Sequence, residues 1–240
     1  MSKVALVTGG TRGIGSAIST KLKDSGYKVI ANYASNDESA KKFSESENID
    51  VMKWDVSNFE DCTKAINEIY EKFSNIDILV NNAGITRDAP LHKMSLENWE
   101  KVISVNLSSV FNLTSLTINK MRDNGFGRII NISSVNGQKG QFGQTNYAAS
   151  KSALIGFSKS LALESASKGI TSNVICPGYI NTEMVAAIRE DILKGIIDTI
   201  PSKRLGESKE IAEMVDYLIS EKASYINGAT FSINGGLWMY

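Results

Sequence analysis

The stretch VALVTGGTRGIG, residues 4–15, joins an apolar run to a glycine-rich turn and then to residues with helical spacing. Glycines in such a turn let the backbone approach a pyrophosphate closely, because no Cβ stands in the way. The helix that follows offers free N–H groups and a partial positive charge to phosphates. The spacing Gly-xxx-Gly-x-Gly departs from the common GxGxxG, so a tight structural turn is the alternative. The position directly after a strand favours a dinucleotide-binding turn that includes Gly9, Gly13, Ile14 and Gly15.

Outward from this stretch, short apolar runs alternate with helical patterns along most of the chain. The runs that read as strands are residues 3–7, 28–33, 50–54, 76–80, 128–132, 171–175 and 230–233, and the clearest helical patterns are residues 14–25, 58–73 and 147–167. Nearly continuous apolar runs are typical of parallel strands buried on both faces. The pattern predicts an α/β fold with a single Rossmann-type, doubly wound parallel sheet of about seven strands and helices on both faces.

The chain shows no proline-rich or serine-rich linker and no repeat, so residues 1–240 are expected to form a single NAD(P)-binding domain. The charge run at residues 37–47 alternates in sign, which indicates a solvated helix face. The stretch 177–206 fits no strand. We expect it to contain a mobile lid segment over the substrate, near residues 178–206.

Composition excludes several classes of protein. The 240 residues are 42% hydrophobic and 22% charged, which excludes a disordered, collagen-like or coiled-coil chain. Lys+Arg and Asp+Glu both number 26, so no overall positive field attracts nucleic acid or an anionic membrane. The single histidine, His92, leaves no basis for a His-rich zinc site, and we expect no metal. Cys62 and Cys176 lie far apart and form no CxxC, which favours a reducing, cytoplasmic setting. No apolar run reaches the roughly 7–15 residues of a signal peptide or the ~18 of a membrane span.

The end of the second strand favours NADP(H) over NAD(H). In the usual fold an acidic residue about 20 positions beyond the glycine turn binds the adenosine ribose 2′-OH. Here that region, residues 30–36, reads IANYASN and contains no carboxylate that would repel a 2′-phosphate. Arg12 in the glycine turn can pair with such a phosphate, unless it simply faces solvent. Asp55, after the third strand, can accept a hydrogen bond from the adenine amino group or act as a carboxylate at a helix N-terminus.

A Ser, Tyr and Lys set follows the strand at residues 128–132. Ser134 lies just beyond it, Tyr147 comes 13 residues later and Lys151 four residues after that. Positions i and i+4 share a helix face. A free tyrosine has a pKa of about 10, and a nearby ammonium lowers it. Tyr147 could then protonate a carbonyl oxygen that Ser134 holds in place. By spacing alone, a Tyr-xxx-Lys pair on the surface is the alternative.

Together these features resemble the short-chain dehydrogenase/reductase family, over essentially the whole chain. The residues that match the family's patterns are the glycine turn, Asn81-Asn82-Ala83-Gly84, Asn106, Ser134, Tyr147, Lys151, Pro177, Gly178 and Thr182. The resemblance implies that Asn82, Ala83 and Gly84 support the adenosine side, and that Pro177, Gly178 and Thr182 lie over the nicotinamide.

The resemblance also implies a mechanism. The nicotinamide passes hydride to a carbonyl carbon and Tyr147 protonates the oxygen. Lys151 binds the nicotinamide ribose and lowers the pKa of Tyr147, Asn106 holds a water that connects Lys151 to solvent, and Ser134 orients the carbonyl. The expected cofactor is NADP(H).

Within the family, residues 81–88, 131–147 and 177–185 resemble the reductases that act on acetoacetyl-CoA in polyhydroxybutyrate synthesis. That resemblance implies an acetoacetyl pocket lined by Gln141, Phe142, Gln144 and Tyr179, with Asp88 beside it. Glutamine amides can donate to the keto and thioester oxygens, and a short acyl chain needs only a small apolar wall. A polar loop for the glutamines and a packing aromatic for Tyr179 are the alternatives.

Other interpretations remain open. The near neighbour is 3-oxoacyl-[acyl-carrier-protein] reductase of fatty-acid synthesis, whose acidic partner protein calls for basic residues near the site. Residues 122–128, RDNGFGR, offer few, although Arg128 and Lys168 could serve. Lys139 and Arg189 could equally attract the phosphates of CoA. A cofactor-binding regulator without activity is disfavoured, because Tyr147 and Lys151 are both present.

The resemblance predicts a homotetramer with two kinds of interface. One uses the helices after Asn106 and after Tyr147, and the other uses the last strand and the tail. The tail, residues 233–240, is apolar and aromatic, where a free chain end would favour polar residues. Packing of the tail within its own chain is the alternative.

Overall fold

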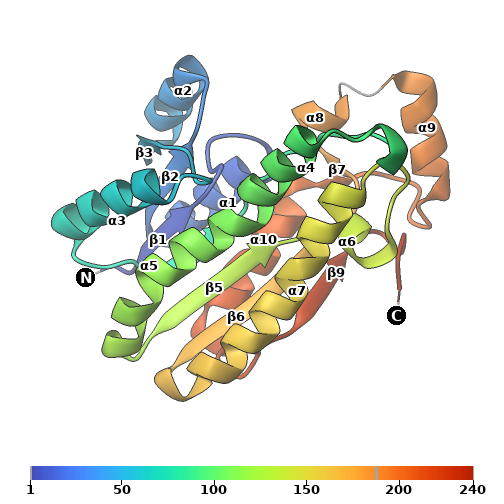
Figure 1. Ribbon diagram of the computed structural model, residues 1–240. Helices are drawn as coiled ribbons and strands as arrows, with labels where there is room; N and C mark the ends of the chain where they lie inside the picture. Colours follow the sequence, from blue (N-terminus) through green and yellow to red (C-terminus); the bar gives the residue numbers. More distant parts are fainter. Residues whose placement is uncertain (1, 187–188, 240) are drawn as a thin grey trace.

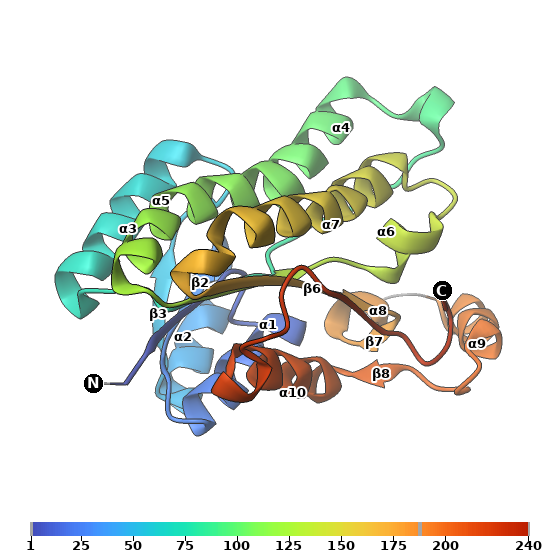
Figure 2. The ribbon, with the colours of Figure 1, turned by 90° about the horizontal axis from the view of Figure 1, so that it is seen from below.

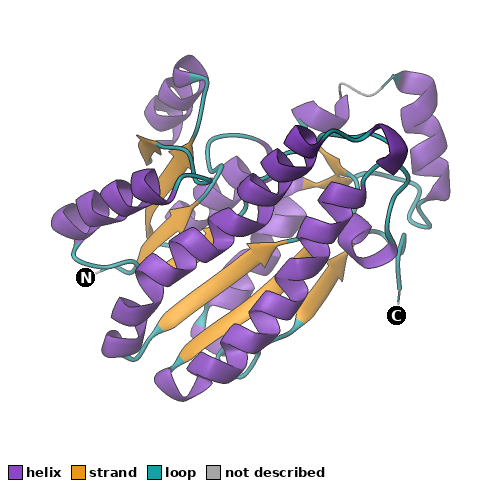
Figure 3. Ribbon diagram, viewed as in Figure 1, coloured by secondary structure: helices purple, strands orange, loops and turns teal. Residues whose placement is uncertain are grey.

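The computed structural model describes residues 2–186 and 189–239. Within these residues, seven parallel strands form one sheet in the order β3-β2-β1-β4-β5-β6-β9, visible as the orange arrows of Figure 3. The strands are β1 (Val4–Val7), β2 (Lys28–Tyr33), β3 (Asp50–Lys53), β4 (Ile78–Asn81), β5 (Gly127–Ile132), β6 (Ile170–Pro177) and β9 (Thr230–Ile233). The sheet is the predicted Rossmann-type arrangement.

The helices form one layer on each side of this sheet. In chain order they are α1 (Gly13–Asp24), α2 (Asp37–Glu47), α3 (Phe59–Phe73), α4 (Leu96–Ile103), α5 (Ser109–Asn124), α6 (Val135–Lys139), α7 (Thr145–Ser165), α8 (Glu183–Ala186), α9 (Glu190–Thr199) and α10 (Ser208–Ile219). Helices α1, α2 and α10 lie on one face, and α3, α5 and α7 on the other (Figures 1 and 2). Short 3-10 turns connect some of them at η1 (Leu91–Lys93), η3 (Ala166–Lys168) and η4 (Glu221–Ala223). A π-helical stretch, η2 (Ser104–Ser108), joins α4 to α5.

Burial explains the two layers. All four residues of β1 are buried, and alternate ones point to opposite faces. Ile18 and Leu22 of α1 belong to one core, whereas Ile66 of α3 and Leu113 of α5 belong to the other. All four are fully buried, and each such side chain stabilises the fold by roughly 1.5–3 kcal/mol.

The chain reverses direction across the sheet beside β1, and this determines where a ligand can bind. From β1 the chain proceeds outward to β2 and β3, then returns to β4 on the other side of β1. In open parallel sheets the crevice at the carboxyl ends of the strands, at such a switch point, is the usual ligand site. Thr8 follows β1 and Asn82 follows β4, so both lie in that crevice.

Predicted and observed elements agree closely, with one correction. The seven predicted strands and three predicted helices are present within two residues at every boundary, and the charge run is helix α2. The expectation that residues 177–206 contain no strand is wrong. Two short strands, β7 (Ile180–Asn181) and β8 (Gly206–Glu207), pair in parallel at its two ends, because residues far apart in sequence supply each other's hydrogen bonds. Residues 187–188 of the expected lid segment lie outside the described residues.

No helix in the described part of the chain is both long and apolar enough to cross a membrane.

Candidate active site

The glycine turn after β1 depends on glycine at defined positions. Gly9 and Gly13 have φ of 58° and 53°, in the left-handed region that favours glycine. A Cβ on Gly15 would overlap the carbonyl oxygen of Gly9 and lie 2.6 Å from the Asn82 side-chain nitrogen. The turn can therefore lie directly on the first turn of α1 only because Gly15 has no side chain.

Asn82 and Thr8 hold this turn against β4. The Thr8 hydroxyl accepts from the backbone N–H groups of Asn82 and Ala83, both at 2.9 Å. In return, Asn82 Nδ2 donates to the carbonyl oxygens of Thr8 at 2.9 Å and Gly9 at 3.2 Å. The predicted adenosine-side residues thus form one unit with the turn.

The N-terminus of α1 suits a phosphate group. Arg12 is its N-cap residue, and no side chain caps the helix there. First-turn N–H groups then remain available to an anion, as in other dinucleotide-binding turns. The Thr182 side chain lies 3.6 Å from where a Cβ on Gly13 would stand, so the segment after β7 also reaches the turn. These residues fit a dinucleotide's pyrophosphate.

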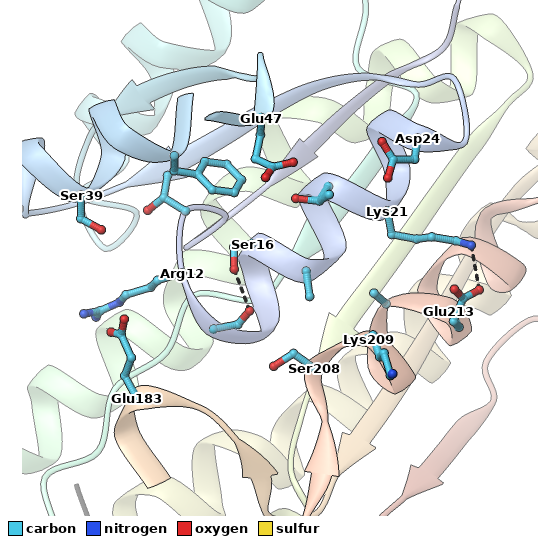
Figure 4. A pocket seen from close by; sticks show the side chains of 16 residues that line it. Arg12, Ser16, Lys21, Asp24, Ser39, Glu47, Glu183, Ser208, Lys209 and Glu213 are labelled. Atoms are coloured by element: carbon cyan, nitrogen blue, oxygen red, sulfur yellow. Dashed lines mark hydrogen bonds and ion pairs between the residues drawn. The ribbon is translucent and has the colours of Figure 1, made fainter. Parts of the chain in front are cut away.

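Beside this turn is a cavity of about 580 Å³ between α1, α2 and α10. The exposed Arg12 lines its mouth together with Ser39 of α2 and Glu183 of α8 (Figure 4). The side chains of Arg12 and Glu183 point toward each other in that view. Sequence analysis singled out Arg12 but not Glu183, which is 171 positions away and is placed beside it only by the fold.

The end of β2 is neutral, as predicted, and its asparagine faces inward. Asn32 Oδ1 accepts from the Gly9 N–H at 3.3 Å, and Nδ2 donates to the Trp54 carbonyl at 3.1 Å. The first carboxylate beyond the strand is Asp37, whose pKa is lowered by its hydrogen bond from Lys53 at 2.9 Å. That carboxylate is accordingly paired with a cation.

Asp55 has local partners at both of its carboxylate oxygens. Its Oδ1 accepts from the Ser57 N–H at 2.8 Å and from the Ser57 hydroxyl at 2.6 Å, and its Oδ2 lies 3.7 Å from Lys101 Nζ. Burial opposes ionisation, but these bonds outweigh it and lower the pKa of Asp55. Asn58, not Asp55, is the N-cap of α3. An adenine contact for Asp55 stays a prediction.

Ser134, Tyr147 and Lys151 meet at the carboxyl end of β5. Ser134 is the N-cap residue of α6 and accepts from the Asn136 N–H at 3.1 Å. The Ser134 hydroxyl is hydrogen-bonded to the phenol of Tyr147. Lys151, one turn further along α7, lies with its Nζ 5.9 Å from the Tyr147 ring centroid and donates to the Ile132 carbonyl at 2.8 Å. The predicted cluster is thus assembled in space.

The electrostatics of this pair differ from the prediction. Burial raises the pKa of Tyr147, and the hydrogen bond from Ser134 only partly offsets that effect. Burial also lowers the pKa of Lys151 to about 8. We expected Lys151 to lower the pKa of Tyr147. Instead the ammonium is directed at the Ile132 carbonyl, and desolvation is the largest effect on the phenol.

Asn106 fixes the residues that follow β4 next to Lys151. It lies in the π-helical stretch η2 and is 1% exposed. Its Oδ1 accepts from the Ile85 N–H at 2.8 Å, and its Nδ2 donates to the Ile85 carbonyl at 3.0 Å and the Ser150 hydroxyl at 3.2 Å. Gly84, the residue before Ile85, lies next to Lys151. A Cβ on Gly84 would stand 3.3 Å from Lys151 Nζ. The Asn106 side chain is therefore engaged by protein groups, and its contact with a water stays a prediction.

Three of the five predicted acyl-pocket residues are linked by hydrogen bonds. Gln144 Nε2 donates to Asp88 Oδ2 at 2.9 Å, and Gln144 Oε1 accepts from Asn136 Nδ2 at 3.0 Å. The Asn136 amide is also hydrogen-bonded to the Tyr179 hydroxyl. Asn136, which joins the others, was missed by sequence analysis. Its position two residues after Ser134 was the only available signal.

The other two predicted pocket residues lie on the surface. Phe142 is 86% exposed, and the exposed Gln141 accepts from Lys139 Nζ at 3.0 Å. The structure does not bring them into the hydrogen-bonded cluster. Their loop is anchored to the other side of the site, because the Ala89 N–H donates to the Gly143 carbonyl at 2.8 Å.

Pro177 and Gly178 connect the site to the tail. The Gly178 N–H donates to the Ile233 carbonyl at 2.9 Å. A Cβ on Gly178 would stand 2.8 Å from Asn234 Cα, so only glycine allows this approach. The predicted nicotinamide-side segment is thus held beside β9.

Comparison with known proteins agrees with this architecture. A family model described as enoyl-(acyl carrier protein) reductase matches residues 9–238. The chain is 57% identical over 237 residues to the acetoacetyl-CoA reductase of Rhizobium meliloti (strain 1021), and 56% identical over 237 residues to that of Shinella zoogloeoides, with 98% of each chain covered in both cases. It is 46% identical over 239 residues to the 3-oxoacyl-[acyl-carrier-protein] reductase of Salmonella typhimurium, covering 99% of this chain and 98% of that relative.

Proposed function

The chain belongs to the short-chain dehydrogenase/reductase family of oxidoreductases, and from this premise we propose that it reduces acetoacetyl-CoA to (R)-3-hydroxybutanoyl-CoA with NADPH. The observation that carries the reaction class is the Tyr147 phenol, hydrogen-bonded to Ser134 and one helical turn from the buried Lys151. The choice of substrate is supported by the relatives at 57% and 56% identity, both acetoacetyl-CoA reductases.

The cofactor is a nicotinamide dinucleotide, and NADP(H) is our proposal for its identity. Backbone N–H groups at Gly13, Ile14 and Gly15 would hold the pyrophosphate. Arg12 at the cavity mouth would pair with the 2′-phosphate, since the end of β2 has no carboxylate there. The remaining proposed contacts are Gly9, Asp55, Asn82, Ala83, Gly84, Tyr147, Lys151, Pro177, Gly178 and Thr182. When bound, the reduced nicotinamide supplies the hydride.

In the reaction, the protein delivers a proton through Tyr147 and keeps a positive charge on Lys151. Tyr147 donates its phenolic proton to the carbonyl oxygen as the alkoxide forms. Its raised pKa keeps it protonated at neutral pH, which suits reduction of a ketone. Ser134 donates to the same oxygen and fixes its position. Lys151, with a pKa of about 8, is still largely an ammonium at pH 7 and would bind the nicotinamide ribose.

The acyl group would lie against the hydrogen-bonded chain of Asp88, Gln144 and Tyr179. Gln144 keeps one N–H for a substrate oxygen after bonding to Asp88. Gln141 and Phe142, on their exposed loop, would cover the substrate from outside, together with the proposed lid near residues 178–206.

A carrier-protein thioester is the second candidate substrate, favoured by the relative at 46% identity. The structure offers little basic surface for an acidic partner at the predicted positions. Arg128 is 3% exposed and donates to the carbonyls of Gly127 at 2.9 Å and Gly169 at 3.0 Å. Lys168 remains exposed. The CoA phosphates could instead meet Lys139 or Arg189, although Arg189 is paired with Asp191.

The test is cofactor oxidation followed at 340 nm, with NADPH or NADH and with acetoacetyl-CoA or acetoacetyl-acyl carrier protein. We expect the largest kcat/KM for acetoacetyl-CoA with NADPH. A larger kcat/KM for the carrier-protein substrate would assign the enzyme to fatty-acid synthesis and leave the proton-donor assignment unchanged. A larger value with NADH would overturn the assignment of Arg12.

A further inference from the structure

Asn136 occupies the point where the catalytic cluster and the acyl pocket meet. It is the second residue of α6 and is 8% exposed. Its backbone N–H donates to the Ser134 hydroxyl at 3.1 Å, and that hydroxyl is hydrogen-bonded to the Tyr147 phenol. Its side chain contacts Gln144 and Tyr179. A single buried residue thus touches the oxygen-binding serine and both inner pocket residues.

The direction of hydrogen bonding along this chain is set by a charge. An ionised carboxylate can only accept, so Asp88 requires the Nε2 side of the Gln144 amide. The oxygen of Gln144 must then face Asn136, which in turn must present Nδ2. The Asn136 Nδ2 group is therefore directed at Gln144.

The side-chain oxygen of Asn136 takes no part in these bonds. Asn136 Oδ1 is buried and has no hydrogen-bond partner within the described residues. A leucine would fill nearly the same space without an unsatisfied acceptor, and such an acceptor is unfavourable. Packing alone does not explain an amide here. Its contribution lies in the N–H group that holds Gln144.

We propose that Asn136 is a positioning residue, one that fixes the Gln144 amide relative to Ser134 and so sets the affinity for the 3-oxoacyl thioester. This inference rests on the proposed function. Without Asn136, the Gln144 amide is held only at its Asp88 end and its remaining N–H is no longer aimed at the substrate. The loss falls on substrate binding, because Ser134, Tyr147 and Lys151 keep their side chains.

The experiment compares Asn136→Leu with Asn136→Asp, in which the side chain has the same shape but no N–H groups. Gln138→Leu is the matched control, since Gln138 is an amide on the same helix whose side chain bonds to Ser232 at 3.0 Å. For both Asn136 variants we expect KM for acetoacetyl-CoA to rise about tenfold or more, as for loss of a ligand-orienting hydrogen bond, with kcat within about threefold. NADPH Kd should stay close to wild type in both variants, Tm should stay close to wild type in Asn136→Leu, and Gln138→Leu should match wild type throughout.

A double-mutant comparison separates positioning from simple structural support. If Asn136 acts through Gln144, then Asn136→Leu combined with Gln144→Leu should raise KM no further than Gln144→Leu alone. Additive increases, an unchanged KM in Asn136→Leu and Asn136→Asp, or an equal loss of NADPH affinity would each overturn the proposal. If the wild type prefers the carrier-protein thioester, the same comparison uses that substrate. Failure of the proposed substrate and failure of the Asn136 role are then separate results.

Discussion

At the scale of single residues, burial governs the chemistry of the site. Tyr147 and Lys151 share a helix face, yet the fold desolvates both, which raises one pKa and lowers the other. At neutral pH this leaves a protonated phenol next to a largely protonated amine. Such a pair is ready to give a proton, which is what the reduction of a ketone needs.

Replacing Tyr147 with Phe removes the proton donor and leaves the ring. We expect kcat to fall by about 10²–10⁴-fold, the usual contribution of a positioned general acid. NADPH affinity, measured by fluorescence titration, should remain near that of the wild type. Retained turnover would show that another group protonates the substrate.

The pH dependence follows from Lys151. Its folded-state pKa of about 8 means that its charge is present below pH 8 and lost as pH rises through 8, well before Tyr147 ionises. The kcat/KM for reduction should therefore decline above about pH 8. In Lys151→Arg, whose guanidinium keeps its charge, any remaining activity should decline only at higher pH. A wild-type profile that is flat to pH 10 would contradict the role given to the ammonium.

Arg12 is expected to determine cofactor preference. In Arg12→Ala, the Kd for NADPH should rise about tenfold or more through loss of a charge-assisted bond, with the Kd for NADH within about twofold. Lys21→Ala is the control, because Lys21 lines the same cavity but pairs with Glu213 at 2.8 Å. Equal effects of Arg12→Ala on both cofactors would mean that Arg12 meets no 2′-phosphate.

At the scale of elements, short connecting segments position several side chains of the site, and the long helix α7 bears Tyr147 and Lys151. Helix α6 has five residues, but its N-cap is Ser134 and its second residue is Asn136. The π-helical stretch η2 carries Asn106, which fixes the residues after β4 over Lys151. Strands β7 and β8 have two residues each, yet they tie together the two ends of the segment that carries α8 and α9.

The contact between the glycine turn and α1 provides a test at this scale. In Gly15→Ala the new Cβ would overlap the Gly9 carbonyl, so we expect the free energy of unfolding to fall by about 1–3 kcal/mol. Binding of NADPH should weaken as well, because the turn must move. Gly156→Ala on α7 is the control, since a Cβ there has no neighbour within 4 Å, and it should leave NADPH affinity unchanged. Unaltered stability and cofactor affinity in Gly15→Ala would refute this account of the turn.

At the scale of the whole molecule, the switch point beside β1 collects residues from distant parts of the chain. The glycine turn, the Asn82 segment, the β5 end and the Pro177 segment all reach the same edge of the sheet. The Ser202 N–H donates to the Gly235 carbonyl at 3.1 Å, so the tail packs at least partly within its own chain, the alternative noted from the sequence. Tyr240, also part of that predicted interface, lies outside the described residues.

Exposed apolar side chains on α5 and α7 fit the proposed homotetramer. Phe111 is 58% exposed and Leu163 is 86% exposed. We expect light scattering to give four times the 26.1 kDa mass of the chain, and Leu163→Glu to reduce the mass measured. A monomer mass for the wild type would rule out the tetramer.

The amino-acid sequence by itself determined what local patterns carry. Continuous apolar runs predicted the strands, the glycine spacing predicted the turn after β1, and the interval between Tyr147 and Lys151 placed both on one helix face. These features depend on neighbours within a few residues. Only the tertiary structure decided which distant groups meet: Glu183 beside Arg12, β7 beside β8, and Asn136 between Gln144 and Tyr179. It also left Phe142 exposed and reversed the expected pKa shift of Tyr147. The physical reason is that long-range hydrogen bonds and desolvation depend on how whole elements pack, and no short stretch of sequence contains that information.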